Sequence, residues 1–101
     1  MSNVAVLARI PAQPGKRAQL VEALRGAFPH VEAEPGTRFY IVHEDASDDD
    51  AVWFYEVYED EAAFEAHRTA GWMKDFGMSV REFAAGRPEL TMLRPVGGKG
   101  L

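Results

Sequence analysis

The stretch AVWFYEVYE (residues 51–59) restricts the possible folds more than any other part of the sequence. It is rich in aromatic and β-branched residues, which indicates a strand. Successive side chains of a strand point to opposite faces of its sheet. Both faces are therefore aromatic, with Val52, Phe54, Glu56 and Tyr58 on one and Trp53, Tyr55 and Val57 on the other. The fold must shield both sides of this sheet from water.

The first apolar run, VAVLARI (residues 4–10), also reads as a strand that is buried on both faces. Leaving about six large apolar side chains in water would forgo roughly 10 kcal/mol, which rivals the whole stability of a domain. Exposed patches of this kind usually mark interfaces. We therefore expect the second face to pack on a copy of itself in a symmetric homodimer. The alternative is that the long connections fold over it.

The remaining elements complete one fold pattern. Apolar residues recur at helical spacing from Leu20 to Val31, and Pro29 should stop or kink that helix near Phe28. A strand is predicted over residues 37–44, and Asp60 is a plausible N-cap for a helix over residues 61–70. Gly71 interrupts this helix, a second helical segment runs through residues 73–83, and a short strand follows over residues 89–95.

This order, β-α-β-β-α-β, predicts an α+β, ferredoxin-like fold with a four-stranded antiparallel sheet and its helices on one face. Residues 1–96 are expected to form a single domain, and residues 97–101 a flexible tail.

Composition excludes several classes of function. The formal net charge is −5, which argues against a nucleic-acid partner and against binding to anionic membranes. There is no cysteine, so neither disulfides nor thiolate metal sites are expected. No signal peptide and no apolar run of membrane-spanning length is visible. We expect a cytoplasmic protein.

Glu56 and His67 are the candidate catalytic residues. Glu56 is a carboxylate in the middle of an apolar strand, either satisfied by a structural hydrogen bond or held in a pocket with a raised pKa. His67 shares a helical side with Ala63, Phe64 and Ala70. A histidine there can be a core residue, but histidine is also the side chain best suited to move protons near neutral pH.

No metal site is predicted. His30 and His43 read as structural or exposed, and the three histidines show no ligand spacing. The acidic loop EDASDDD (residues 44–50) lacks the glycine and spacing of an EF-hand, so it reads as a solvated loop. There is also no glycine-rich phosphate loop and no nucleophile elbow.

From Val4 to Leu93 the chain resembles the antibiotic biosynthesis monooxygenase family. Members typically show Glu-Pro-Gly, a strand with Tyr, a strand ending in Tyr-Glu, an acidic helix start, and then Ala-x-x-x-His. These elements appear here as Glu34-Pro35-Gly36, Tyr40, Tyr55-Glu56, Asp60-Glu61 and Ala63 to His67. Their order and spacing together are fairly specific for the family and not for a substrate.

The resemblance implies a dimeric α+β barrel with a pocket between sheet and helices, and it implies that Glu56 and His67 lie at that pocket. The expected activity is oxidation of a small electron-rich aromatic, such as a quinol or phenol, by O2 without a bound cofactor. His67 would be the base or a hydrogen-bonding partner of the substrate oxygen, and Glu56 would fix its tautomer. Five residues would form the substrate-binding walls: Tyr40, Phe54, Tyr58, Trp72 and Phe76. The alternatives are a non-oxidative isomerase and a non-catalytic small-ligand-binding protein in which Glu56 and His67 are a buried structural pair.

One departure from the family pattern bears on mechanism. Many members carry a second histidine shortly after the first, whereas Trp72 stands at that position here. The haem-degrading branch has Trp where His67 stands and His where Gly77 stands. Neither substitution is present, so haem degradation is not expected.

Overall fold

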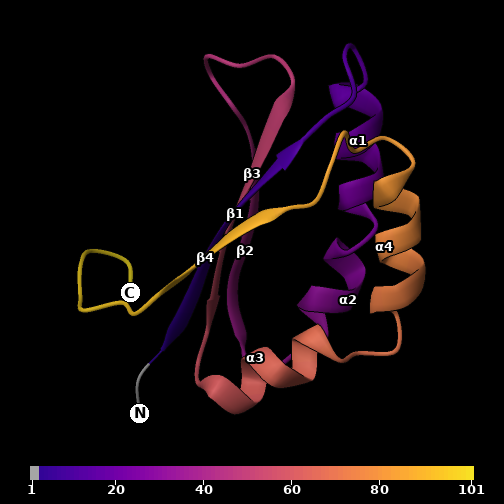
Figure 1. Ribbon diagram of the computed structural model, residues 1–101. Coiled ribbons are helices and arrows are strands. Elements are labelled where there is room, and N and C mark those ends of the chain that lie inside the picture. Colours follow the sequence, from indigo (N-terminus) through magenta and orange to yellow (C-terminus); the bar gives the residue numbers. More distant parts are fainter. Residues whose placement is uncertain (1–2) are drawn as a thin grey trace.

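The computed structural model describes residues 3–101 and contains one four-stranded antiparallel sheet in the order β2-β3-β1-β4 (Figure 1). The strands are β1 (Val4–Pro11), β2 (Thr37–Glu44), β3 (Ala51–Tyr58) and β4 (Glu89–Leu93). The helices are α1 (Arg17–Arg25), α2 (Phe28–Glu32), α3 (Glu61–Arg68) and α4 (Met73–Arg81). The predicted ferredoxin-like arrangement is confirmed, and each of its two helical connections is divided into two helices.

The second division lies at Gly71, as the sequence predicts, whereas the first lies a few residues before the predicted stop near Phe28, and Pro29 helps to begin a helix and does not end one. α1 ends at Arg25, and α2 begins at Phe28 with Pro29 in its first turn, where a missing N–H leaves no helical hydrogen bond unmade. α3 ends at Arg68, and α4 begins at Met73, on either side of Gly71. At the start of α3, the carboxylate of Asp60 accepts a hydrogen bond from the Ala63 N–H at 2.8 Å, which confirms the predicted N-cap.

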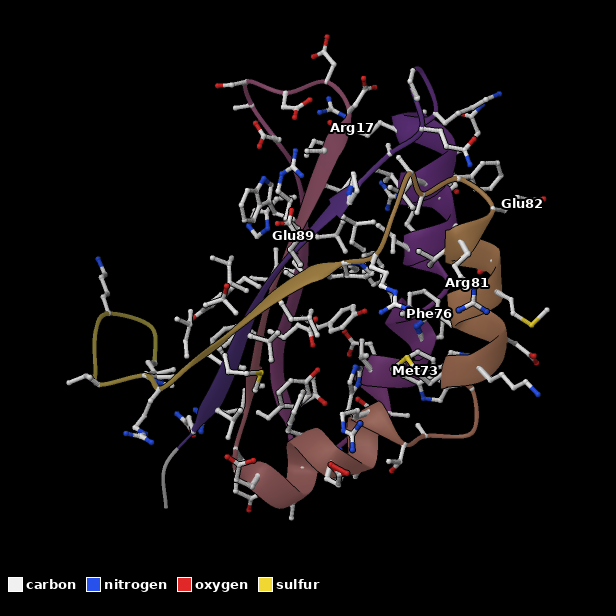
Figure 2. All side chains as sticks on the ribbon, viewed as in Figure 1. Arg17, Met73, Phe76, Arg81, Glu82 and Glu89 are labelled. Atoms are coloured by element: carbon white, nitrogen blue, oxygen red, sulfur yellow. The ribbon has the colours of Figure 1, made fainter. Side chains whose placement is uncertain are left out.

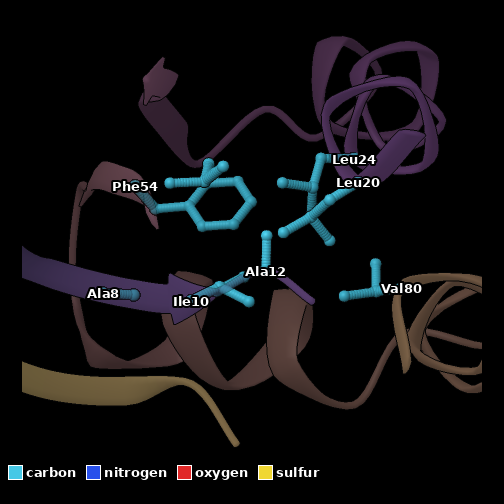
Figure 3. Packing of buried hydrophobic residues seen from close by; sticks show 8 residues of the cluster. Ala8, Ile10, Ala12, Leu20, Leu24, Phe54 and Val80 are labelled. Carbon is cyan, nitrogen blue, oxygen red and sulfur yellow. The ribbon is translucent and has the colours of Figure 1, made fainter. Parts of the chain in front are cut away.

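The core lies between the helices and one face of the sheet. Ala8 and Ile10 of β1 and Phe54 of β3 pack against Leu24 of α1 and Val80 of α4 (Figure 3). A second cluster lies nearer α3, where Val4, Val6 and Tyr58 contact Ala63 and Phe64. The predicted division of β1 and β3 into two faces is therefore confirmed for the helical side. In residues 3–101 no helix is long and apolar enough to cross a membrane.

The opposite face of the sheet carries no helix. Leu7, Tyr55 and Ile41 lie side by side across β1, β3 and β2 in the observed register, and alternation turns them away from the helices. Ile41 is 43% exposed and Leu93 of β4 is 42% exposed. The connection between β2 and β3 reaches this face at Trp53, whose indole N–H donates to Asp45 at 2.7 Å. We call this surface, made by Leu7, Ile41, Tyr55 and Leu93, the open sheet face.

Candidate active site

A cavity of about 880 Å³ lies between the helical side of the sheet and the helices. That volume is in the range that takes a drug-sized ligand. All four strands and three helices contribute to its wall. Most of the wall is apolar: Val6, Ala8, Ile10, Leu24, Phe54, Phe64, Phe76, Val80 and Leu90. The polar groups at one end of the cavity are Tyr40, Glu56 and His67. The cavity therefore combines an apolar body with one end capable of proton transfer.

His67 is buried at the inner side of α3, with 6% of its surface exposed. Its Nδ1 lies 2.9 Å from a carboxylate oxygen of Glu34, while its Nε2 lies 3.9 Å from the nearer oxygen of Glu56. A carboxylate accepts hydrogen bonds, so Nδ1 is the ring nitrogen that carries the proton. Nε2 is then the basic nitrogen, and it points toward Glu56 at the cavity that both residues line.

Glu34 is a residue of the candidate site that the sequence did not predict. It lies before the turn into β2, and the same oxygen that contacts His67 also accepts a hydrogen bond from the Thr37 hydroxyl at 2.8 Å. The sequence led us to expect that Glu56 fixes the tautomer of His67. The Nδ1–H donates instead to Glu34, and the 3.9 Å between Nε2 and Glu56 is too long for a hydrogen bond. In the sequence, Glu34 appeared only as part of the Glu34-Pro35-Gly36 motif. That motif indicated the family but gave no role for the Glu34 side chain.

Glu56 is satisfied by a different partner. The Tyr58 hydroxyl donates to it at 2.5 Å from two positions along the same face of β3. Burial raises the pKa of Glu56 above its ordinary value of 4.5, and the hydrogen bond from Tyr58 and the charge of His67 oppose this shift only in part. Burial and the nearby carboxylates also raise the pKa of Tyr40 and of Tyr58. Both phenols therefore remain protonated at neutral pH.

The predicted aromatic residues gather around His67, but they do not all line the cavity. Ring centroids of Tyr40, Tyr58 and Trp72 lie 5.6, 5.1 and 5.5 Å from that of His67. Tyr40, Phe54 and Phe76 line the large cavity as expected. Tyr58 is fully buried behind Glu56, and Trp72 lies outside the lining.

Trp72 belongs to a second cavity of about 670 Å³ on the other side of His67. There its indole stacks on the ring of His30, with centroids 4.7 Å apart and planes at 7°. Glu34 also borders this second cavity, and His67 borders both. The imidazole thus separates the two cavities, with Nδ1 and Glu34 on the side of the second.

Within residues 3–101, no three His, Cys, Asp or Glu side chains are grouped so as to hold a metal ion.

Close packing of the Glu34 turn against α3 brings Glu34 to His67. A Cβ on Gly36 would lie only 2.5 Å from the Cβ of Ala63, so the turn can approach the helix this closely only because residue 36 is a glycine.

We expect Gly36→Ala to lower the free energy of unfolding by about 1–3 kcal/mol through overpacking. Gly71→Ala is the matched control, because a Cβ at Gly71 meets nothing within 4 Å. Denaturant unfolding of the two variants checks this, and equal stabilities would contradict the observed packing.

The raised pKa of Glu56 predicts a pH dependence of stability. The folded state holds the Glu56 proton to higher pH than the unfolded state, so stability falls as pH rises from about 4.5 through the folded-state pKa. Glu56→Gln cannot ionise and still offers an oxygen to Tyr58. Its stability relative to wild type should therefore increase from acid to alkaline pH.

Urea unfolding at a series of values between about pH 4 and pH 9 measures this difference. The exposed Glu32→Gln serves as control and should follow the wild-type curve. A Glu56→Gln curve parallel to wild type over the whole range would show that Glu56 ionises as readily in the folded chain as in the unfolded one.

Comparisons with known proteins agree with this architecture. The family model described as antibiotic biosynthesis monooxygenase matches residues 3–77. Rv0793 from Mycobacterium tuberculosis is 28% identical, with a TM-score of 0.86, and the match covers 98% of this chain and 100% of that one. A Chloroflexus aurantiacus protein whose name refers to the same family is also 28% identical, with a TM-score of 0.83 and 98% of both chains covered.

A Caulobacter crescentus protein also named for that family is 23% identical, and its TM-score of 0.89 over 95% of this chain and 92% of that one shows a shared fold. The comparison with curated proteins gives no match.

Proposed function

The chain belongs to the antibiotic biosynthesis monooxygenase family, and from that premise we propose that it oxidises a phenol or quinol with O2, using His67 as the base. The single observation that supports this most is the orientation of His67. Glu34 holds the proton on Nδ1, which leaves a basic Nε2 at the polar end of a mostly apolar cavity. A phenol bound with its ring against Phe54 and Phe76 would place its hydroxyl within reach of that nitrogen.

The reaction begins with transfer of the phenolic proton to Nε2. The phenolate then passes one electron to O2, which avoids the spin barrier to direct reaction between a singlet molecule and triplet oxygen. The phenoxyl radical and superoxide combine at a ring carbon to form a carbon–oxygen bond, and the resulting peroxide takes the proton back from the imidazolium. Cleavage of the O–O bond, with loss of the proton from that carbon, gives a carbonyl and one molecule of water. The substrate supplies all the electrons, so the proposal requires no bound cofactor.

Glu34 and Glu56 have separate roles in this scheme. The carboxylate of Glu34 stabilises the imidazolium that forms when Nε2 takes the proton, since it lies 2.9 Å from Nδ1. Glu56 lies in the cavity with a raised pKa, so its neutral form can donate a hydrogen bond to the reduced oxygen species. Two carboxyl groups in different environments commonly take different roles in one site. Here the ionised Glu34 stabilises a positive charge, and the neutral Glu56 donates a hydrogen bond.

Oxygen uptake by the purified protein, measured with a panel of phenols and quinols, tests the proposal. The expected result is uptake that depends on both protein and substrate, with one atom of labelled oxygen in the product and one in water. Uptake by none of the panel, or label in hydrogen peroxide alone, would contradict a monooxygenase.

A second candidate is proton transfer without oxygen, as in an isomerase. It is favoured by the 3.9 Å separation of two proton-transfer groups, His67 and Glu56, at one cavity. Such a pair can remove a proton at one atom of a substrate and return it at another. Turnover that continues unchanged under strict exclusion of O2 would support this candidate over the oxidation.

A further inference from the structure

The rim of the large cavity carries positive charge at a distance from His67. Arg81 at the end of α4 and Arg87 in the connection between α4 and β4 both line the cavity. A third lining arginine, Arg68, is held by Glu65 through hydrogen bonds of 3.0 and 2.7 Å. In residues 3–101, neither Arg81 nor Arg87 takes part in an ion pair with a carboxylate. Two guanidinium groups at this rim are therefore available to a ligand.

The side chain of Arg81 is directed along α4 toward the cavity wall. A Cβ on Gly77 would lie 3.6 Å from Nη1 of Arg81, so the guanidinium folds back one turn to lie beside Gly77. Side chains of a helix incline toward its N-terminus, which favours this course. Phe76 and Met73 project from the same helix and also line the cavity (Figure 2). On its cavity side, α4 thus presents the apolar Met73 and Phe76 beside the guanidinium of Arg81.

The charge at this rim is a local feature. The chain as a whole has a formal net charge of −5, so a pair of free arginines at the cavity mouth opposes the average charge of the surface. Guanidinium groups bind carboxylates and phosphates through paired hydrogen bonds. The acidic residue that lines the cavity, Glu56, lies instead at the His67 end, and Glu34 contacts His67 from the second cavity. A carboxylate of a ligand would be repelled at that end and attracted at the rim, whereas a phenolate formed by proton transfer to His67 is paired with the imidazolium that the transfer creates.

From this distribution we propose that the cavity binds an aromatic acid, with its hydroxyl end at His67 and its carboxylate at Arg81 and Arg87. The orientation of the hydroxyl rests on the proposed function. The carboxylate site is argued separately, from the positive charge of Arg81 and Arg87 and from their place in the cavity lining. A cavity of about 880 Å³ has room for a ligand with two fused rings.

Binding of 6-hydroxy-2-naphthoic acid and of its methyl ester under nitrogen tests the proposal without any need for turnover. The two probes share the ring and the hydroxyl and differ in the negative charge. Wild-type protein should bind the acid about tenfold or more tightly than the ester, as a charge-assisted pair of hydrogen bonds allows. The preference should decrease as salt is added, because the arginines are exposed.

The variant Arg81→Met/Arg87→Met should lose the preference for the acid and retain its affinity for the ester. Lys74→Met, an exposed cation of α4 outside the cavity lining, is the matched control and should behave as wild type. Equal binding of acid and ester by wild type, absence of acid binding, or a preference that persists in the double variant would each overturn the proposal. A clear preference in a protein that consumes no oxygen would leave this inference standing and refute the oxidation instead.

Discussion

Replacing His67 by alanine should lower the rate of substrate oxidation by roughly 10²–10⁴-fold, the usual contribution of a positioned general base. The imidazole is the group whose basic nitrogen lies at the polar end of the large cavity. Without it, the phenolic proton has no acceptor held in place, and the electron-rich anion does not accumulate. The measurement is steady-state oxygen uptake with the best substrate of the phenol and quinol panel.

Two further variants test whether the loss of rate comes from the missing base. One is a control for loss of a histidine, and the other removes the charge beside His67. His43→Ala removes an exposed histidine of β2 and should leave the rate unchanged. Glu34→Gln keeps the shape of the side chain that contacts Nδ1 but removes the charge that stabilises the imidazolium. Its rate should lie between those of wild type and His67→Ala. Wild-type rates in folded His67→Ala, judged by its circular dichroism, would exclude the imidazole as the base.

Replacing Ile41 by aspartate should weaken self-association by about 100-fold or more, because a symmetric interface would bury the new charge without a partner in each copy. Ile41 is part of the open sheet face, with Leu7 and Tyr55 beside it in register. We propose that a second copy of the chain covers this face and completes a dimeric barrel. The proposal accounts for a row of apolar side chains that no helix covers.

The control is Met78→Asp, which introduces the same charge at an exposed apolar residue of α4, on the other side of the molecule from the open sheet face. It should leave the association state as in wild type. Sedimentation equilibrium of the three proteins over a range of concentrations measures the dissociation constants. A monomeric wild type, or an Ile41→Asp variant that associates as wild type does, would show that the face serves another purpose.

Local patterns were sufficient to predict the fold. The alternation in β1 and β3, the cap at Asp60 and the break at Gly71 all follow from neighbouring residues, and the structure confirms each of them. The second helical connection divides at Gly71 as expected, whereas the first divides after Arg25, earlier than the expected stop near Phe28. Because these features depend on spacing of a few residues, no knowledge of distant contacts is needed to predict them.

The site was harder to predict because its parts are distant in the sequence. Glu34 and His67 are 33 positions apart, and they meet because Gly36 allows the turn to approach α3 closely. Nothing in the pattern around Glu34 indicates this approach. Trp72 was expected in the cavity wall, yet the interruption at Gly71 places it against His30 in the neighbouring cavity. The sequence thus predicted several residues that line the cavity, namely Tyr40, Phe54, Glu56, His67 and Phe76, but not the hydrogen-bond partners of Glu56 and His67.

The protonation state of a bound phenol tests the central claim most directly, since the claim is that His67 takes the phenolic proton. The absorbance of 4-nitrophenol distinguishes its coloured anion from its colourless neutral form. The measurement is made under nitrogen, at a pH where the free phenol is neutral. We expect wild-type protein to bind the probe as its anion and His67→Ala to bind it in the neutral form. A neutral spectrum on wild-type protein at saturation, or an anion spectrum of equal strength on His67→Ala, would contradict the account.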